Sequence, residues 1–223
     1  MKKPQVNYSN FTFSKLFTPE FSHLLLLSGW VVYFLLYFLT ENLIPIENCH
    51  PIHSYLDDII PFCEWFVLPY VFWYALIVIS LWYFALYNVT NFKRLQVYIM
   101  ITQALAMAVY IIYPSCQNLR PEVFPRENIL SSLVGFLYAF DTNTGVFPSL
   151  HCAYSLGIAS VWLREKSVSR WWKAFVVVAV VLICLSTMFI KQHSALDFFG
   201  AIPVCLVAEY LVFFRFFPQK STK

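Results

Sequence analysis

The chain has 223 residues, of which 60% are hydrophobic and 20% aromatic, while only 12% are charged. Soluble domains average about 25% charged residues, so this chain has too few polar groups to cover a water-soluble particle, and lipid must cover part of it. The net charge is +3 without a Lys/Arg-rich run, which argues against a nucleic-acid surface.

Six apolar segments are candidates to cross a bilayer, which takes roughly 20 helical residues. They are 22–40, 64–87, 95–114, 147–163, 173–190 and 197–217. The fourth is the shortest, and Ser149, His151 and Ser155 interrupt its beginning; polar groups at such depth are tolerated only inside protein or beside a water-filled cavity. We therefore predict an all-α polytopic membrane protein, a six-helix transmembrane bundle that forms a single domain over 1–223.

Basic residues fix the predicted orientation. All but three of the 15 Lys and Arg lie in the termini or in the connections at 88–94 and 164–173, the exceptions being Arg120, Arg126 and Lys191. Cytoplasmic segments carry an excess of Lys and Arg, so both termini are predicted to be cytoplasmic. The outer connections are then 41–61, 115–146 and 191–196.

Two histidines are predicted to meet at the outer side. The fourth and fifth segments are antiparallel and joined by a short loop, so His151 and His193 lie at neighbouring ends. Asp197 follows His193 by four residues, one helical turn, so their side chains can touch. A carboxylate bonded to one imidazole nitrogen fixes the tautomer and leaves the other nitrogen free to attack. These three residues are the candidate catalytic group.

Two imidazoles, a carboxylate and nearby cations suit phosphoryl transfer. We expect His193 to attack phosphorus and form a phosphohistidine, while His151 protonates the leaving alkoxide and then acts as a base on water. Arg120 and Lys191 are expected to hold the non-bridging oxygens. Ser149 can cap the fourth helix, whose first N–H groups would point at an anion. No metal or other cofactor is expected.

Three stretches, within about 115–200, carry a resemblance to a known family. They are F-P-S-L-H at 147–151, S-T-M-F-I-K-Q-H-S-A-L-D at 186–197 and R-P at 120–121. They resemble the P-S-G-H, S-R-x5-H-x3-D and K-x6-R-P motifs of the type 2 phosphatidic acid phosphatase superfamily. The resemblance implies a metal-independent integral-membrane lipid phosphatase or phosphotransferase. It makes His193 the nucleophile, His151 the acid/base and Asp197 the orienting carboxylate, with Ser149 and Arg120 as phosphate contacts.

Three positions depart from these motifs. Tyr113 stands for the first-motif lysine, Leu150 for the second-motif glycine and Thr187 for the third-motif arginine. Two of three expected cationic phosphate ligands are therefore replaced, and Lys191 or Arg126 is the available substitute. The P-S-L-H and S-T-M patterns are similar to the branch that includes inositol phosphorylceramide synthase-like transferases, which would make an acceptor alcohol possible in place of water.

The favoured prediction is a lipid phosphatase of the plasma or cytoplasmic membrane whose site faces the extracytoplasmic side, with the bilayer and a membrane lipid as its partners. A phosphotransferase acting on an alcohol is the alternative. The same triad also fits a proton-coupled transporter or a 2-His-1-carboxylate metal site. His50 and His53 are interpreted as solvated loop residues or, less favoured, metal ligands. The sequence leaves open the lipid, the oligomeric state and any disulfide among the outer cysteines.

Overall fold

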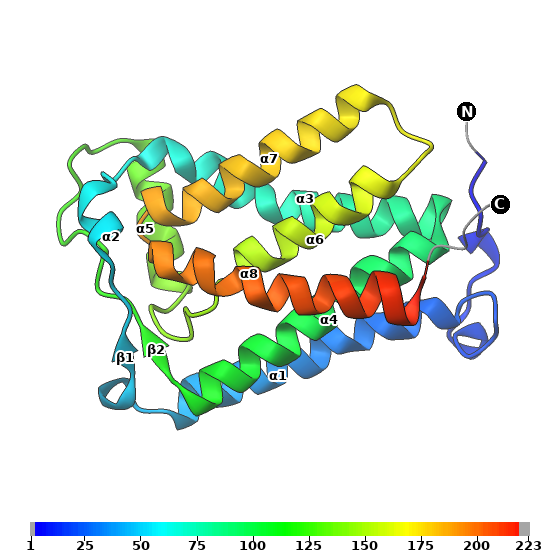
Figure 1. Ribbon diagram of the computed structural model, residues 1–223, viewed down its shortest axis with the longest axis horizontal. Coiled ribbons are helices and arrows are strands. Elements are labelled where there is room, and N and C mark those ends of the chain that lie inside the picture. The colour runs from blue at the N-terminus through cyan, green and yellow to red at the C-terminus, as the bar shows by residue number, and fades with distance from the viewer. Residues whose placement is uncertain (1–2, 219–223) are drawn as a thin grey trace.

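The chain folds into a bundle of long helices whose two ends differ in structure (Figure 1). The structure is a computed structural model that describes residues 3–218. The long helices are α1 (Ser28–Leu43), α3 (Val67–Tyr87), α4 (Val89–Ile112), α6 (Leu150–Arg164), α7 (Arg170–Phe189) and α8 (Ala195–Tyr210). Two short helices and two short strands gather at one end of the bundle: α2 (Tyr55–Ile59), α5 (Ile129–Phe140), β1 (His50–Pro51) and β2 (Ser115–Cys116). The strands pair in parallel.

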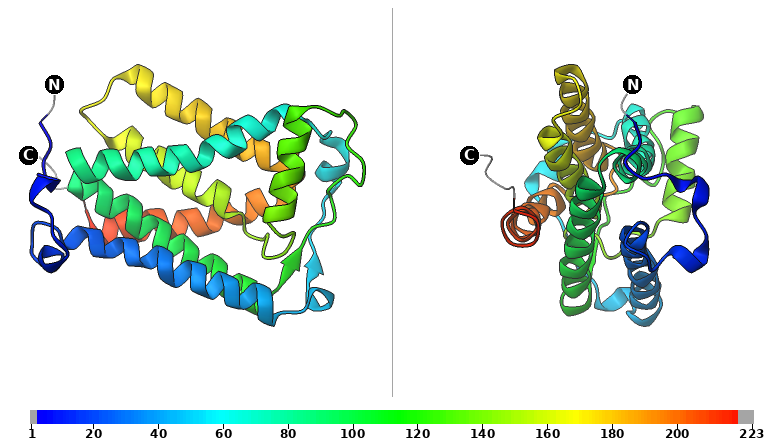
Figure 2. Two further views of the ribbon diagram at one scale, coloured as in Figure 1. Left: turned by 180° about the vertical axis from the view of Figure 1, so that it is seen from behind. Right: turned by 90° about the vertical axis from the view of Figure 1, so that its right-hand side faces the viewer.

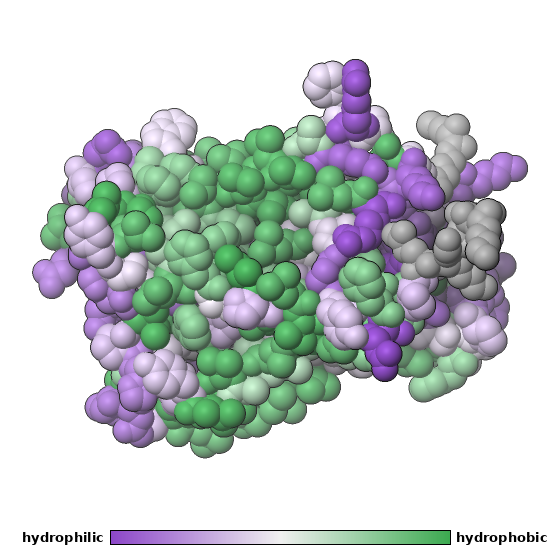
Figure 3. Space-filling view, in the orientation of Figure 1, coloured by the Kyte–Doolittle hydropathy of each residue, from purple (hydrophilic) through white to green (hydrophobic). Residues whose placement is uncertain are grey.

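Within the described part of the chain, five helical segments are long and apolar enough to cross a membrane. They are Ser22–Leu43, Glu64–Tyr87, Val89–Ile112, Arg170–Phe189 and Ala195–Phe216, the first two beginning in 3-10 turns and the last ending in a π-helical turn. Figure 3 shows a broad hydrophobic face between two hydrophilic ends. This is the architecture of an integral membrane protein.

The predicted segment at 147–163 corresponds to α6, which has 15 residues. At roughly 1.5 Å per residue it is about 22 Å long, short of the ~30 Å hydrocarbon layer. It packs against α3, α4, α7 and α8, which makes it the central helix of the bundle. Figure 1 shows α6 starting nearer the middle of the bundle than α8 does. The start of α6 is therefore surrounded by protein.

The connection at 115–146, predicted to be a loop, contains the apolar helix α5 of 12 residues. Asn128 begins it by accepting hydrogen bonds from the backbone N–H groups of Leu130 and Ser131. Together with α2 and the strand pair, α5 covers one end of the bundle (Figure 2). That end is a folded layer rather than a set of loose connections.

The ends of the bundle also separate the basic residues. The α3–α4 and α6–α7 turns lie at the end where the described chain begins and finishes, and Arg120, Arg126 and Lys191 belong to the opposite end (Figure 1). Lys2, Lys220 and Lys223, which the sequence assigns to the first group, lie outside the described residues.

Candidate active site

The turn between α7 and α8 presents His193. The N–H of Lys191 donates to the carbonyl of Met188 (3.1 Å), and the N–H of Gln192 donates to the carbonyl of Thr187 (3.0 Å). These two bonds form a Schellman turn, in which Lys191 takes the left-handed conformation (φ 56°) that glycine usually occupies. The turn ends α7 sharply and directs His193 toward the start of α8.

Asp197 holds both His193 and the N-terminus of α8. Its Oδ2 accepts a hydrogen bond from Nδ1 of His193 (3.0 Å) and one from the backbone N–H of Ser194 (3.0 Å). Ser194 and Asp197 thereby form a capping box. Because Nδ1 is bonded to the carboxylate, Nε2 is the nitrogen that a substrate can reach.

Burial and charge act in opposite directions on His193. Burial lowers its pKa, but the hydrogen bond and charge of Asp197 outweigh burial, so the pKa of His193 is raised above its usual value. The imidazolium is therefore stabilised by the carboxylate that also orients the ring.

His151 lies opposite His193, on the first turn of α6. The two ring centroids are 5.6 Å apart, with an angle of 62° between the ring planes. The His151 ring packs against Trp73 (4.0 Å between centroids) and Tyr70 (4.6 Å) of α3. Its Nε2 is buried and has no hydrogen-bond partner among the described residues. The structure thus brings His151, His193 and Asp197 together, and their catalytic role stays a prediction.

Asp57 of α2 reaches the same turn, a contact that the sequence analysis missed. Its Oδ2 accepts a hydrogen bond from the Ser194 hydroxyl (2.5 Å), and its Oδ1 accepts one from the N–H of Ala195 (2.7 Å). Burial raises the pKa of Asp57, but these bonds and those from Ser54 outweigh it and lower the pKa. A charged, buried carboxylate therefore ties α2 to the start of α8. Asp57 and Ser194 are far apart in the sequence, and no sequence pattern connects them.

The two cations expected to hold phosphate are bonded to backbone carbonyls instead. The guanidinium of Arg120 donates to the carbonyls of Tyr138 (3.0 Å), Asp141 (2.9 Å) and Thr142 (2.8 Å), at the C-terminus of α5. The ammonium of Lys191 donates to two carbonyls at the end of α2. Positive groups at helix C-termini satisfy unpaired carbonyls and oppose the helix dipole. Both residues therefore stabilise the layer that α2, α5 and the strand pair form at this end of the bundle.

The other sequence candidates are also accounted for by contacts. Ser149 is the N-cap of α6, as predicted, and its hydroxyl accepts a hydrogen bond from the N–H of Cys152 (3.5 Å). Arg126 forms two hydrogen bonds with the buried Glu64 (2.8 and 2.7 Å). Tyr113, at the position of the family's lysine, stacks on His50 with ring centroids 4.3 Å apart. None of these three residues lines the cavity described next.

A cavity of about 780 Å³ contains the two histidines in its wall. Its other lining residues come mainly from α1, α3 and the segment that follows α5, and they include nine aromatic side chains: Trp30, Tyr33, Phe34, Tyr37, Trp73, Tyr74, Tyr110, Phe140 and Tyr154. Phe34 on α1 and Val78 on α3 line the cavity and are also exposed on the outside of the bundle. The cavity therefore opens sideways between α1 and α3, where a membrane protein meets lipid chains.

Two carboxylates, Glu41 and Asp141, line the same cavity, whereas none of the described residues that line it is Lys or Arg. The Oδ2 of Asp141 accepts hydrogen bonds from Gln192 (3.1 Å) and Tyr70 (3.4 Å). The cavity is thus aromatic, lined by acidic and imidazole groups.

No family model, no curated protein and no solved structure matches this chain. Among residues 3–218, no group of three or more His, Cys, Asp and Glu side chains is arranged to hold a metal ion. His53 instead pairs with Asp58 at 2.8 Å on the surface.

Proposed function

We propose that this chain is a membrane enzyme that takes a phosphoryl group from a lipid through a phosphohistidine on His193, and releases it to water as a lipid phosphatase. The observation that carries the proposal is the pair of imidazole rings 5.6 Å apart in the wall of a laterally open cavity, one of them bonded to a buried carboxylate. The motifs that resemble the type 2 phosphatidic acid phosphatase superfamily support it, and membership of that family is part of the proposal.

The chemistry proceeds in two steps. In the first, Nε2 of His193 forms a bond to phosphorus, the bond from phosphorus to the lipid oxygen breaks, and His151 gives its proton to that oxygen. In the second, His151 takes a proton from water, the oxygen of that water attacks phosphorus, and the bond to His193 breaks. Asp197 holds the His193 ring in place and stabilises its positive charge in both steps.

Electrostatics favour a second candidate, transfer of a substituted phosphoryl group to an alcohol. A phosphate monoester carries up to two negative charges, and such sites usually supply Lys, Arg or a metal ion to balance them. Here the first turn of α6, with its positive dipole end, and a protonated His151 are the positive groups in the cavity wall, because His193 must be neutral to attack. That set suits the single charge of a phosphodiester better, as in headgroup exchange.

The same proposal includes a topology. Both ends of the described chain and the basic α3–α4 and α6–α7 turns lie at one end of the bundle, which we assign to the cytoplasm. The histidines are then nearer the extracytoplasmic side. The segment 141–149 together with α6 makes the sixth crossing, because α6 alone is too short.

The test is turnover and phosphoenzyme trapping with a panel of lipid phosphates. His193→Ala should abolish release of phosphate and the acid-labile, base-stable phosphoprotein, because alanine has no nitrogen that can attack phosphorus. His53→Ala is the matched control, since that histidine is exposed and pairs with Asp58, and it should keep the full rate.

Three outcomes distinguish the hypotheses. A His193→Ala protein that works at full rate ends the proposal. Headgroup exchange without release of phosphate to water selects the transferase. A wild-type protein that turns over no phosphate ester leaves proton-coupled transport as the function to pursue.

A further inference from the structure

The aromatic cavity contains two carboxylates in addition to its two histidines. Its polar wall holds the carboxylates of Glu41 and Asp141 on the side of the layer formed by α2, α5 and the strand pair, and no described Lys or Arg balances them within the lining. Arg120 approaches Asp141 from outside the cavity, where its guanidinium is bonded to carbonyls of the α5 terminus. A wall of this kind repels a second negative charge and attracts a positive one.

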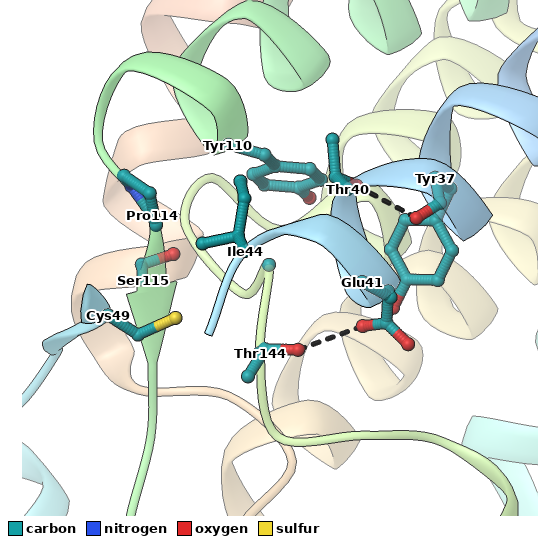
Figure 4. Close-up of a pocket in the computed structure, with 10 residues that line it drawn as sticks. Tyr37, Thr40, Glu41, Ile44, Cys49, Tyr110, Pro114, Ser115 and Thr144 are labelled. Atoms are coloured by element: carbon teal, nitrogen blue, oxygen red, sulfur yellow. Dashed lines mark hydrogen bonds between the residues drawn. The ribbon is translucent and has the colours of Figure 1, made fainter. Parts of the chain in front are cut away.

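The carboxylates are held in place and have oxygens to spare. Glu41 accepts hydrogen bonds at Oε1 from the hydroxyls of Thr142 and Thr144. Figure 4 shows the bond from Thr144. Asp141 accepts from Tyr70 and Gln192, both at Oδ2. Among the described contacts, Oε2 of Glu41 and Oδ1 of Asp141 are therefore left for a ligand.

Tyrosine rings stand beside these carboxylates. Tyr33 and Tyr37 stack with centroids 5.9 Å apart on the α1 side of the cavity, and each lies within electrostatic range of both carboxylates. Tyr74 of α3 also lines the cavity and lies within electrostatic range of Asp141. Aromatic faces combined with carboxylates are the usual surroundings of alkylammonium ligands, which are attracted by the ring quadrupole and by the negative charge.

We propose that the cavity binds a lipid whose phosphate is esterified to an alkylammonium alcohol, with the ammonium held by Glu41, Asp141 and the tyrosines and the phosphate next to the histidines. This rests on the proposed function for the placement of the phosphate. The lipid chains lie in the lateral opening beside Phe34 and Val78. A zwitterionic headgroup supplies the positive charge that the cavity wall lacks, and leaves phosphorus with a single negative charge.

Binding is tested apart from turnover in the His193→Ala protein, purified in detergent. Two short-chain probes are compared, dihexanoyl phosphatidylcholine and dihexanoyl phosphatidate, with the fluorescence of the cavity residues Trp30 and Trp73 as the readout. We expect tighter binding of the choline lipid. Glu41→Gln and Asp141→Asn keep a hydrogen-bonding oxygen, and each should weaken the binding of the choline lipid by roughly tenfold. The binding of phosphatidate should not be weakened. The control is Glu47→Gln, which removes an exposed carboxylate outside the cavity and should leave the binding of both lipids unchanged.

Free phosphocholine, the third probe, separates a lipid from a soluble headgroup. It should bind more weakly than the choline lipid because it lacks the apolar chains, and equal binding would overturn the lipid part of the inference. Equal binding of both lipids, or an equal loss for both in the two variants, would overturn the headgroup part.

These failures are distinguishable from a failure of the proposed function. If the wild-type protein hydrolyses phosphatidate and does not bind the choline lipid, the proposed function is supported and the headgroup inference is overturned. Choline-lipid binding that depends on the carboxylates, without any phosphohistidine in the wild type, keeps the inference and loses the function.

Discussion

At the residue scale, one carboxylate has two tasks in the turn before α8. Asp197 caps the helix through the N–H of Ser194 and orients the His193 ring through Nδ1. A residue that starts a helix cannot move without the helix, so the imidazole is fixed to the bundle itself. Such rigidity is what positioning of a nucleophile requires.

The pH dependence of activity follows from this pair. His193 attacks only when Nε2 is unprotonated, and its pKa is raised above the usual value of about 6.5. The limb of the pH–rate profile on which His193 loses its proton should therefore have its midpoint above about 6.5, and it is opposed by a second limb, on which His151 loses the proton that it gives to the lipid oxygen. In Asp197→Asn the charge is lost and the pKa of His193 falls, so the midpoint should move to lower pH. The maximal rate should drop by roughly 10²–10⁴. A pH–rate profile of both proteins checks this, and an unchanged midpoint would contradict it.

Arg120 is predicted to matter for stability rather than for substrate affinity. Its guanidinium donates to three carbonyls at the end of α5 and lies over the Tyr138 ring. Arg120→Ala should lower the free energy of unfolding by about 2–3 kcal/mol, as expected for loss of charged hydrogen bonds, with KM little changed. The measurement is thermal unfolding beside initial rates. Arg170→Ala, which removes an exposed cation beside Trp171, is the control.

The sequence predicted the histidine pair because its members stand at the ends of two antiparallel apolar runs. It missed Asp57, Glu41 and Asp141, because each lies in an irregular segment or at a helix end where no periodicity indicates direction. It also assigned Arg120 and Lys191 to phosphate, since charge and proximity are visible in a sequence and the orientation of a long side chain is not.

At the element scale, the meeting of α8 with the F-P-S-L-H segment depends on a glycine. A Cβ added at Gly200 would lie 2.3 Å from the Phe147 ring. Gly200→Ala should therefore displace Phe147 and, through it, the start of α6, at a cost of about 1–3 kcal/mol. The rate should fall although residue 200 does not line the cavity. Gly135→Ala is the matched control, because a Cβ added at Gly135 would lie 3.4 Å from the Phe124 ring, an ordinary contact distance. Unfolding and turnover are measured for both variants.

Element boundaries show where apolar length misleads. The sequence predicted a helical span over 147–163. The helix α6 begins three residues later, at Leu150, because Ser149 is its N-cap. It missed α5 because an apolar run of 12 residues resembles buried loop as much as helix. In both places the tertiary environment decides, since α6 packs against four helices and α5 packs against α3 and the turn that precedes α3.

At the scale of the whole molecule, the cavity opens between α1 and α3, and apolar side chains of both helices line the opening. Val78 lines it and is 65% exposed. Val78→Trp should narrow the opening, raise KM several-fold for a long-chain lipid and leave a short-chain soluble analogue unaffected. Val181→Trp, on an exposed position of α7, is the control. Equal effects on both substrates would show that the lipid does not pass between α1 and α3.

The helical membrane architecture could be predicted in its coarse form, because five of the six apolar runs correspond to helices that are long and apolar enough to cross a bilayer. The cavity could not be predicted. It exists because α1 packs along α4 and faces α3 across an open space, and aromatic residues on the two helices look like ordinary lipid-facing positions in the sequence.

The loose attachment of α1 has a kinetic consequence. Only 6% of the most apolar stretch of Ser22–Leu43, the segment that contains α1, is buried inside the protein, so we expect the surrounding acyl chains to support most of this wall of the cavity. Exchange of one bound molecule for the next then requires the bilayer to yield, while the tightly packed helices around α6 stay still. Turnover should accordingly fall abruptly when the host membrane freezes into its gel phase, and a continuous temperature dependence across that transition would place the slow step elsewhere.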